Sequence, residues 1–358
     1  MQLSPLLDAT DRLGWMNFPN RFAMLTTDRR RGRSIAENAI GNGRGKVVPL
    51  LHLSIPSPPI SSFNIGPLTI HFYALCILGG IIIAAFVTAK RIAKVGIPRS
   101  VVLDVSMWAV IVGIVGGRLY HVFTHPGDYF YKGANLWTIF AVWDGGLAIF
   151  GSILFGSLGV YIGCRRAGIR FFAFADALAP GLLFAQAFGR LGNYFNQELY
   201  GPPTTLPWGL QIHASSPAFP AGVPAGTLFQ PLFLYEMIWD IAGAFLILFL
   251  SRRFVMSWGN AMGTYFLWYG TGRAYLETLR LDPTEFHFLG EKINTDVAAA
   301  AAIFGLVILI VQAIRHRGEQ APSGYLPGRY PSTSSVSSPK EAAPEGSTAT
   351  SNIAVPSA

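Results

Sequence analysis

The stretch that decides the fold reads FAFADALAPGLLFAQAFGRLGNYFNQELYG and covers residues 172–201. Its first part, about 172–193, is long and apolar enough for a membrane-spanning helix. Polar groups follow at the end of that helix. They are Arg190, Asn193, Asn196 and Glu198. Because such groups are costly to place in lipid, a functional site is the first hypothesis for this stretch.

The chain as a whole is also rich in apolar residues. Of its 358 residues, 51% are hydrophobic and 13% are charged, whereas soluble domains carry about 25% charged residues. This composition, with repeated apolar runs, predicts an all-α membrane protein, a polytopic bundle of helices. The net charge of +8 resides in short basic clusters between apolar runs, so no nucleic-acid partner is expected.

Seven apolar runs are expected to be transmembrane helices. Each is about as long as the apolar core of a bilayer requires, and three of them end at a pair of basic residues. The expected spans cover residues 70–89, 101–121, 145–164, 172–193, 231–251, 260–280 and 296–314.

The loops between these runs predict the orientation. One set of alternate loops is rich in Lys and Arg, and the other contains only Lys132 and Lys292. The positive-inside rule then places the N-terminus outside, the C-terminus in the cytoplasm, and the polar residues after 189 near the outer face.

The two ends of the chain differ from the 54–315 domain. Residues 1–53 contain eight basic residues and no long apolar run, and they are expected to be a disordered or non-native extension. Eight cations ahead of an outward-facing N-terminus favour a translation start near residue 48. Residues 316–358 are rich in Ser, Pro, Ala and Glu, which predicts a disordered cytoplasmic tail.

The polar residues of the fourth span share one helical face. Gln186, Arg190 and Asn193 follow at i, i+4 and i+7. One interpretation is a hydrogen-bonded seam between helices, with Arg190 snorkelling to the interface. Since Asn196 and Glu198 follow at once, a ligand site is the favoured interpretation.

The sixth span repeats this arrangement. Tyr269, Arg273, Glu277 and Arg280 form one stripe, and charged residues inside a span must face protein or a wet cavity. An arginine side chain can donate two parallel hydrogen bonds to phosphate oxygens. Arg190 and Arg273 therefore predict a common anionic ligand. Glu277 is expected to hold a neighbouring guanidinium in place.

Several further residues have two interpretations. Tyr73 belongs either to an interfacial aromatic belt or to the site. Arg118 is either a snorkelling anchor or a third cation, whereas Asp176 is expected to cap a helix. Glu236 and Asp240, at i and i+4 of the fifth span, bring a carboxylate within reach of the same cavity. No Cys/His cluster has zinc spacing, so no metal is expected.

At these residues the sequence resembles the prolipoprotein diacylglyceryl transferase family over about residues 54–315. The signature is Gly189-Arg190-Leu191-Gly192-Asn193-Tyr194-Phe195-Asn196, followed by Glu198 and Gly201. Further matching segments are Ile70-His71-Phe72-Tyr73, Gly116-Gly117-Arg118-Leu119, Trp143-Asp144-Gly145-Gly146, Leu234-Tyr235-Glu236 and Tyr269-Gly270.

The resemblance implies transfer of the diacylglyceryl group of phosphatidylglycerol to the lipobox cysteine of a prolipoprotein. Glycerol 1-phosphate is released, and neither metal nor diffusible cofactor is involved. The partners implied are phosphatidylglycerol, the prolipoprotein signal peptide and membrane lipids, in the cytoplasmic membrane of a bacterial cell. The implied catalytic residues are Arg190, Asn193, Glu198 and Arg273. The implied phosphatidylglycerol-binding residues are Arg190, Arg273, Tyr73, Tyr269, Asn196, Gly201 and Glu277.

This sequence departs from the family pattern at the proposed base. Some members have a histidine six residues after the aspartate of Trp-Asp-Gly-Gly, where this chain has Phe150. The identity of the base is therefore open. The candidates are Glu198, Tyr269 and His71. In the alternative, the positive field of the arginines generates the thiolate without a dedicated base. Gln230-Pro231 likewise replaces the His-Pro of other members.

Two other classes of function compete with this hypothesis. A transporter or channel for an anionic solute would tend to show inverted repeats and helices broken at the midplane, and the sequence has no repeat. A metal-dependent phospholipid-headgroup enzyme would need clustered aspartates, which the second to sixth spans lack.

Overall fold

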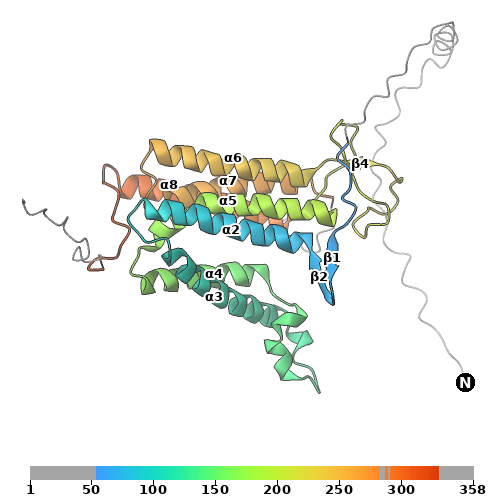
Figure 1. Ribbon diagram of the computed structural model, residues 1–358, viewed down its shortest axis with the longest axis horizontal. Coiled ribbons are helices and arrows are strands. Elements are labelled where there is room, and N and C mark those ends of the chain that lie inside the picture. Colours follow the sequence, from blue (N-terminus) through green and yellow to red (C-terminus); the bar gives the residue numbers. More distant parts are fainter. Residues whose placement is uncertain (1–53, 282–286, 289–290, 330–358) are drawn as a thin grey trace, which may run out of the picture. The chain divides into compact units, whose positions relative to one another are not determined.

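The computed structural model describes residues 54–281, 287–288 and 291–329. In this part of the chain seven helices of 18 residues or more lie side by side (Figure 1). Each overlaps one of the seven expected spans. They are α2 (Phe72–Ala93), α3 (Val101–Thr124), α4 (Ile149–Arg166), α5 (Phe171–Asn196), α6 (Leu232–Arg253), α7 (Asn260–Glu277) and α8 (Ile293–Arg315).

Five of these helices, α2, α3, α5, α6 and α8, are long and apolar enough to cross a membrane. This confirms the class of a multi-pass helical membrane protein. The other two, α4 and α7, have 18 residues each. Arg273 and Glu277 lower the hydropathy of α7, and a pair of arginines ends α4.

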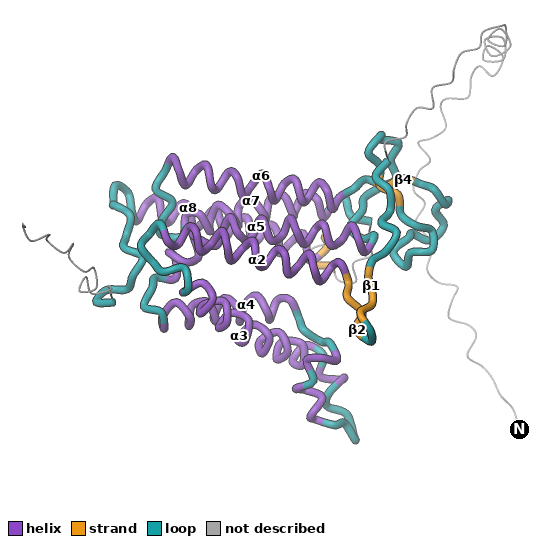
Figure 2. Tube along the Cα trace, viewed as in Figure 1, coloured by secondary structure: helices purple, strands orange, loops and turns teal. Residues whose placement is uncertain are grey.

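Short strands and 3-10 turns occupy the connections (Figure 2). The sequence did not predict these strands, because segments of two to four residues have too little periodicity to detect. The antiparallel pairs are β1 (Ser62–Ile65) with β2 (Leu68–His71), β3 (Leu210–Gln211) with β4 (Leu228–Phe229), and β5 (His287–Phe288) with β6 (Glu291–Lys292). The 3-10 turns are η1 (Pro126–Asp128), η2 (Leu136–Phe140) and η3 (Val142–Asp144).

Small residues let the bundle helices approach closely. A Cβ atom on Gly80 of α2 would lie 2.8 Å from the carbonyl oxygen of Ala185 on α5. Between α7 and α8, a Cβ on Gly270 would lie 2.5 Å from the amide nitrogen of Ala302. Packing of small residues of this kind is a main source of helix association in lipid. Helix α5 packs against α2, α6 and α7.

The α3–α4 hairpin packs mainly on itself. Its helices meet through glycines, with Gly159 against the backbone of Trp108 and Gly163 against Val105. Figure 1 shows the hairpin next to the bundle at one end and apart from it at the other. We call the end at which the hairpin meets the bundle the basic end. We call the opposite end, where α5 ends and α6 begins, the site end.

The segment after α8 lies against the basic end. The backbone amide of Arg170 donates to the carbonyl oxygen of Gly324 at 2.9 Å, and the Tyr325 hydroxyl donates to the carbonyl oxygen of Gly96 at 2.9 Å. Tyr325, in the first part of the predicted tail, also packs on a buried cluster that composition alone does not reveal. Residues 330–358, like the extension 1–53, lie outside the described residues.

Candidate functional site

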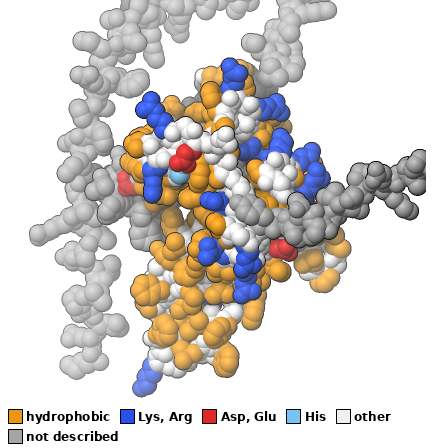
Figure 3. All heavy atoms as spheres, turned by 90° about the vertical axis from the view of Figure 1, so that its left-hand side faces the viewer, with side chains coloured by type: hydrophobic (Ala, Val, Ile, Leu, Met, Phe, Trp, Pro, Cys, Tyr) orange, Lys and Arg blue, Asp and Glu red, His pale blue; other side chains and the backbone are white. Residues whose placement is uncertain are grey.

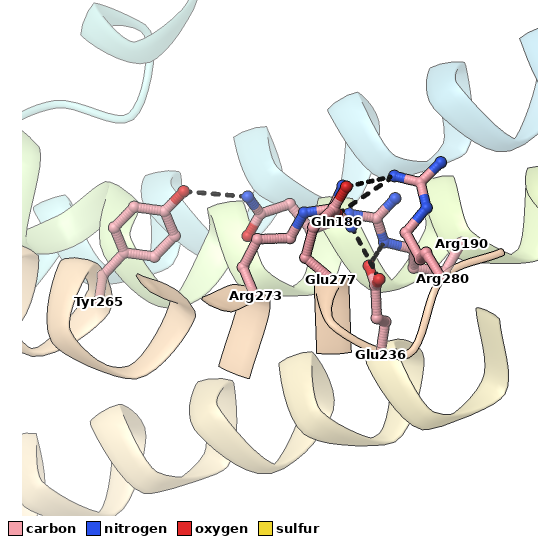
Figure 4. Close-up of polar contacts among 7 residues, drawn as sticks. All are labelled: Gln186, Arg190, Glu236, Tyr265, Arg273, Glu277 and Arg280. Atoms are coloured by element: carbon pink, nitrogen blue, oxygen red, sulfur yellow. Dashed lines mark hydrogen bonds and ion pairs between the residues drawn. The ribbon is translucent and has the colours of Figure 1, made fainter. Parts of the chain in front are cut away.

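The Glu236 carboxylate on α6 lies between two guanidinium groups at the site end (Figure 4). Its Oε2 atom is 2.5 Å from Nε of Arg190 on α5, and its Oε1 atom accepts a hydrogen bond from Nη1 of Arg273 on α7 at 2.7 Å. Glu236 is 4% exposed. One buried carboxylate therefore joins three helices and fixes the distance between two cations.

A second carboxylate, Glu277, extends this arrangement. Its Oε2 atom is 2.6 Å from Nη2 of Arg273, one helical turn earlier, and 3.3 Å from Nη1 of Arg280. The side-chain amide of Asn294 on α8 donates to Oε1 of Glu277 at 3.3 Å. Glu277 is 0% exposed. The result is a chain of alternating charges, Arg190–Glu236–Arg273–Glu277–Arg280.

The guanidinium of Arg190 keeps donors available. Its side chain is 20% exposed, and Glu236 takes only the Nε side. Within the described part of the chain, its two terminal nitrogen atoms make no hydrogen bond. A guanidinium held at one edge and open at the other is suited to an anionic oxygen.

Polar groups continue deeper along the same helices. Asp240, one turn below Glu236, is 3% exposed, and its Oδ2 atom has no hydrogen-bond partner in the described residues. Asp240 lines a small cavity together with Tyr269 and Arg273. Next to it, Gln186 donates to the hydroxyl of Tyr265 at 3.0 Å. The polar face of α5 is thus an interhelical seam at Gln186 and a more open cationic site at Arg190.

The end of α5 turns sharply. Gln197 caps the helix in the left-handed region, with φ of 58°, and its side-chain oxygen accepts a hydrogen bond from the amide of His213 at 2.9 Å. Glu198 follows and is exposed. Asn193 and Asn196 are half-buried, and their side chains make no hydrogen bond to the described residues. Three polar side chains at the end of α5 therefore make no hydrogen bond within the described part of the chain.

Two other predicted residues adjoin this turn. The Tyr73 ring lies so close to Gly192 that a Cβ atom on that glycine would come within 2.6 Å of it. Gly201 is buried, and its amide donates to the carbonyl oxygen of Gln230 at 2.9 Å. Tyr73 thus borders the helix end, whereas Gly201 fixes the loop that leads to α6.

Arg118 and Asp176 lie elsewhere and have structural partners. Arg118 is 7% exposed and donates to the carbonyl oxygens of Thr138, Ile139, Gly145 and Gly146. It clamps the α3–α4 loop and is neither a snorkelling anchor nor a third cation of the site. Asp176 accepts hydrogen bonds from the amides of Gly259 and Met262, so it caps α7 and not its own helix.

Sequence reasoning gave too little weight to Glu236, Asp240 and Arg280. The signal was present, since two carboxylates at i and i+4 in an apolar run must face protein or water. The partners of Glu236 could not be read from the sequence, because Arg190 and Arg273 lie on other helices. Among the described residues, no group of three or more His, Cys, Asp and Glu side chains could hold a metal ion.

Comparison with known proteins identifies the family. The family described as prolipoprotein diacylglyceryl transferase matches residues 60–311, which is more than half of the chain. The chain belongs to the prolipoprotein diacylglyceryl transferase family. It is therefore a transferase, and the match covers every residue of the site described above.

Curated relatives agree with this assignment. A protein of Leifsonia xyli subsp. xyli is 55% identical over 286 residues, which cover 77% of this chain and 85% of that protein. A protein of Paenarthrobacter aurescens is 48% identical over 270 residues, covering 74% and 85%. One of Cutibacterium acnes is 45% identical over 271 residues, covering 76% and 90%. All three are called phosphatidylglycerol–prolipoprotein diacylglyceryl transferase, and they lend no support to the transporter hypothesis.

Proposed function

We propose that this membrane enzyme transfers the diacylglyceryl group of phosphatidylglycerol to the lipobox cysteine thiol of a prolipoprotein. The names of the relatives supply the two substrates. The observation that carries the proposal is the pair Arg190 and Arg273, held by one buried carboxylate at the end of three helices. This pair suits a phosphate that remains bound while its negative charge grows.

The reaction exchanges one bond for another. The cysteine sulfur forms a thioether bond to the terminal carbon of the diacylglyceryl group, and the bond between that carbon and the phosphate oxygen breaks. The electron pair leaves with the phosphate, which becomes glycerol 1-phosphate, and the thiol proton passes to a base or to water. Donors placed around the leaving oxygens stabilise the charge that develops.

The charged side chains of the site have different roles in this reaction. The open edge of Arg190 donates to the phosphate, while Glu236 and Glu277 hold Arg273 in place. Because Glu277 is fully buried, we assign it to positioning and not to lipid contact.

The remaining predicted residues surround the headgroup. The side-chain amides of Asn193 and Asn196, near the end of α5, make no hydrogen bond to the described residues and are suited to headgroup hydroxyls. Tyr73 and Tyr269 border the ligand on α2 and α7, and Gly201 shapes the loop.

A free thiol has a pKa of about 8.5, so the attacking cysteine needs a base or a positive field. Glu198, Tyr269 and His71 are the candidate acceptors, and Phe150 is an exposed apolar residue on α4. Glu198 fits best, because it is the exposed carboxylate that directly follows the polar turn.

The proposed topology has seven spans, with the N-terminus outside and the C-terminus in the cytoplasm. Helices α4 and α7 have 18 residues each, which is about 27 Å of helix and close to the apolar thickness of a bilayer. The site end then faces outward in the bacterial cytoplasmic membrane, where the thiol of a translocated prolipoprotein would arrive.

Purified full-length protein incubated with phosphatidylglycerol and a lipobox peptide should release glycerol phosphate. Arg190→Ala should abolish release, whereas Arg253→Ala, an equal loss of charge at the exposed basic end, should leave it unchanged. An active Arg190→Ala variant would refute the role of the arginine pair. Absence of release from the unmodified protein would refute the proposed activity.

A further inference from the structure

A cavity of about 570 Å³ lies at the basic end, far along α5 from Arg190. Its walls come from the last turns of α2 and α6, the first turn of α5, the end of α4, and residues 322–326. None of these residues belongs to the site described above.

Five basic side chains line this cavity. They are Arg91, Lys94, Arg165, Arg170 and Arg252. The carboxylate among the lining residues is Asp176, and both of its oxygens already accept backbone hydrogen bonds from Gly259 and Met262. The cavity therefore has a large excess of positive charge.

Most of this charge lacks a partner. Within the described ranges, the side chains of Lys94, Arg165 and Arg252 make neither a hydrogen bond nor an ion pair. Arg91 donates from Nη2 to the carbonyl oxygen of Asp176 and to the Ser251 hydroxyl, both at 3.1 Å, but its buried Nε has no partner. An anion in the cavity would supply an acceptor for the lining cations that lack a partner within the described residues.

The rim of the cavity is apolar. Phe172, Phe254 and Val255 line it and are 43%, 61% and 64% exposed. Figure 3 looks onto this end, where Lys and Arg side chains gather above a largely hydrophobic surface. Basic residues at a helix end commonly serve only as topology signals. Here they surround a hollow, and the apolar rim would suit acyl chains.

We propose that this cavity binds the phosphate of an anionic phospholipid from the leaflet at the basic end. The cations hold the headgroup, and Phe172, Phe254 and Val255 contact the first part of the acyl chains. The proposal requires that the bundle is embedded in lipid, but it is independent of the transfer reaction. Each basic residue near an anionic headgroup adds to the attraction.

Native mass spectrometry of the full-length protein tests this directly. The variant Arg165→Gln/Arg252→Gln removes two lining cations, and Arg99→Gln/Arg253→Gln removes two exposed cations outside the cavity. With dioleoyl phosphatidylglycerol, the first should bind the lipid at the basic end about thirtyfold more weakly and so retain one lipid fewer. The second should match the unmodified protein. Lipid at the Arg190 site is common to all three proteins.

Equal lipid retention by the two double variants would overturn the proposal. The proposal would also be overturned if the unmodified protein retained dioleoyl phosphatidylcholine as well as dioleoyl phosphatidylglycerol, because that would indicate a non-specific lipid surface. If inorganic phosphate alone stabilised the unmodified protein but not Arg165→Gln/Arg252→Gln, and no lipid difference appeared, the ligand would be a soluble phosphate. Glycerol phosphate release should not differ between the double variants, so failure of the transferase proposal would be recognised separately.

Discussion

At the scale of single residues, Glu236 holds the site together. Its carboxylate is nearly inaccessible to solvent and touches both Arg190 and Arg273. Breaking a buried charge pair from one side costs about 3–5 kcal/mol, because the remaining charge stays buried without compensation. Two guanidinium groups would lose their common acceptor together.

Glu236→Gln should therefore lower the melting temperature in detergent and abolish glycerol phosphate release. Glu319→Gln is the matched control, since that carboxylate is 52% exposed and, among the described residues, pairs only with His316. Exposed pairs contribute about 0–1 kcal/mol. A Glu236→Gln protein with unchanged melting temperature and activity would contradict the central position of this carboxylate.

At the scale of elements, two tryptophans fix α6 against α7. Trp239 and Trp268 stack with ring centroids 4.2 Å apart, and each indole donates to the carbonyl oxygen of the other residue, at 3.1 and 2.9 Å. A Cβ atom on Gly272 would collide with the Trp239 indole. Since Arg273 follows Gly272 directly, this contact sets the depth at which Arg273 meets Glu236.

Gly272→Ala should destabilise the protein by about 1–3 kcal/mol, the usual cost of overpacking, and should also reduce activity by displacing Arg273. Gly189→Ala is the matched control, because a Cβ there meets no atom within 4 Å and alanine is the better helix former by about 1 kcal/mol. Melting temperatures should therefore shift in opposite directions. A shift of the same sign in both variants would argue against the close α6–α7 contact.

At the scale of the whole molecule, charge separates the two ends of the described bundle. The basic clusters and the 570 Å³ cavity lie at one end, and the Arg190 site with its exposed loop lies at the other. Orientation in the membrane therefore determines which leaflet supplies the lipid substrate and which side the prolipoprotein approaches from.

Single cysteines test the orientation. Ser215→Cys in the loop before α6 should react with a membrane-impermeant maleimide in intact spheroplasts, and Ser100→Cys at the basic end should react only after lysis; both positions are exposed. Cys76→Ala/Cys164→Ala gives the background, since both native cysteines are free thiols. The reverse labelling pattern would invert the proposed topology.

The sequence alone determined the class of protein and most of the polar stripe. Apolar runs of the right length placed all seven helices, and helical spacing put Arg190 on one face of α5 and Arg273 with Glu277 on one face of α7. These inferences succeed because spacing along a helix is a local property, independent of the other helices.

Only the tertiary structure decided which charges meet. It paired Glu236 with two arginines, turned Arg118 into a loop clamp, assigned Asp176 to the start of α7, and placed Tyr325 against the bundle. The physical reason is that ion pairs and caps between helices depend on which faces pack together. Small residues spread along several helices set that packing, and no single stretch of sequence contains it.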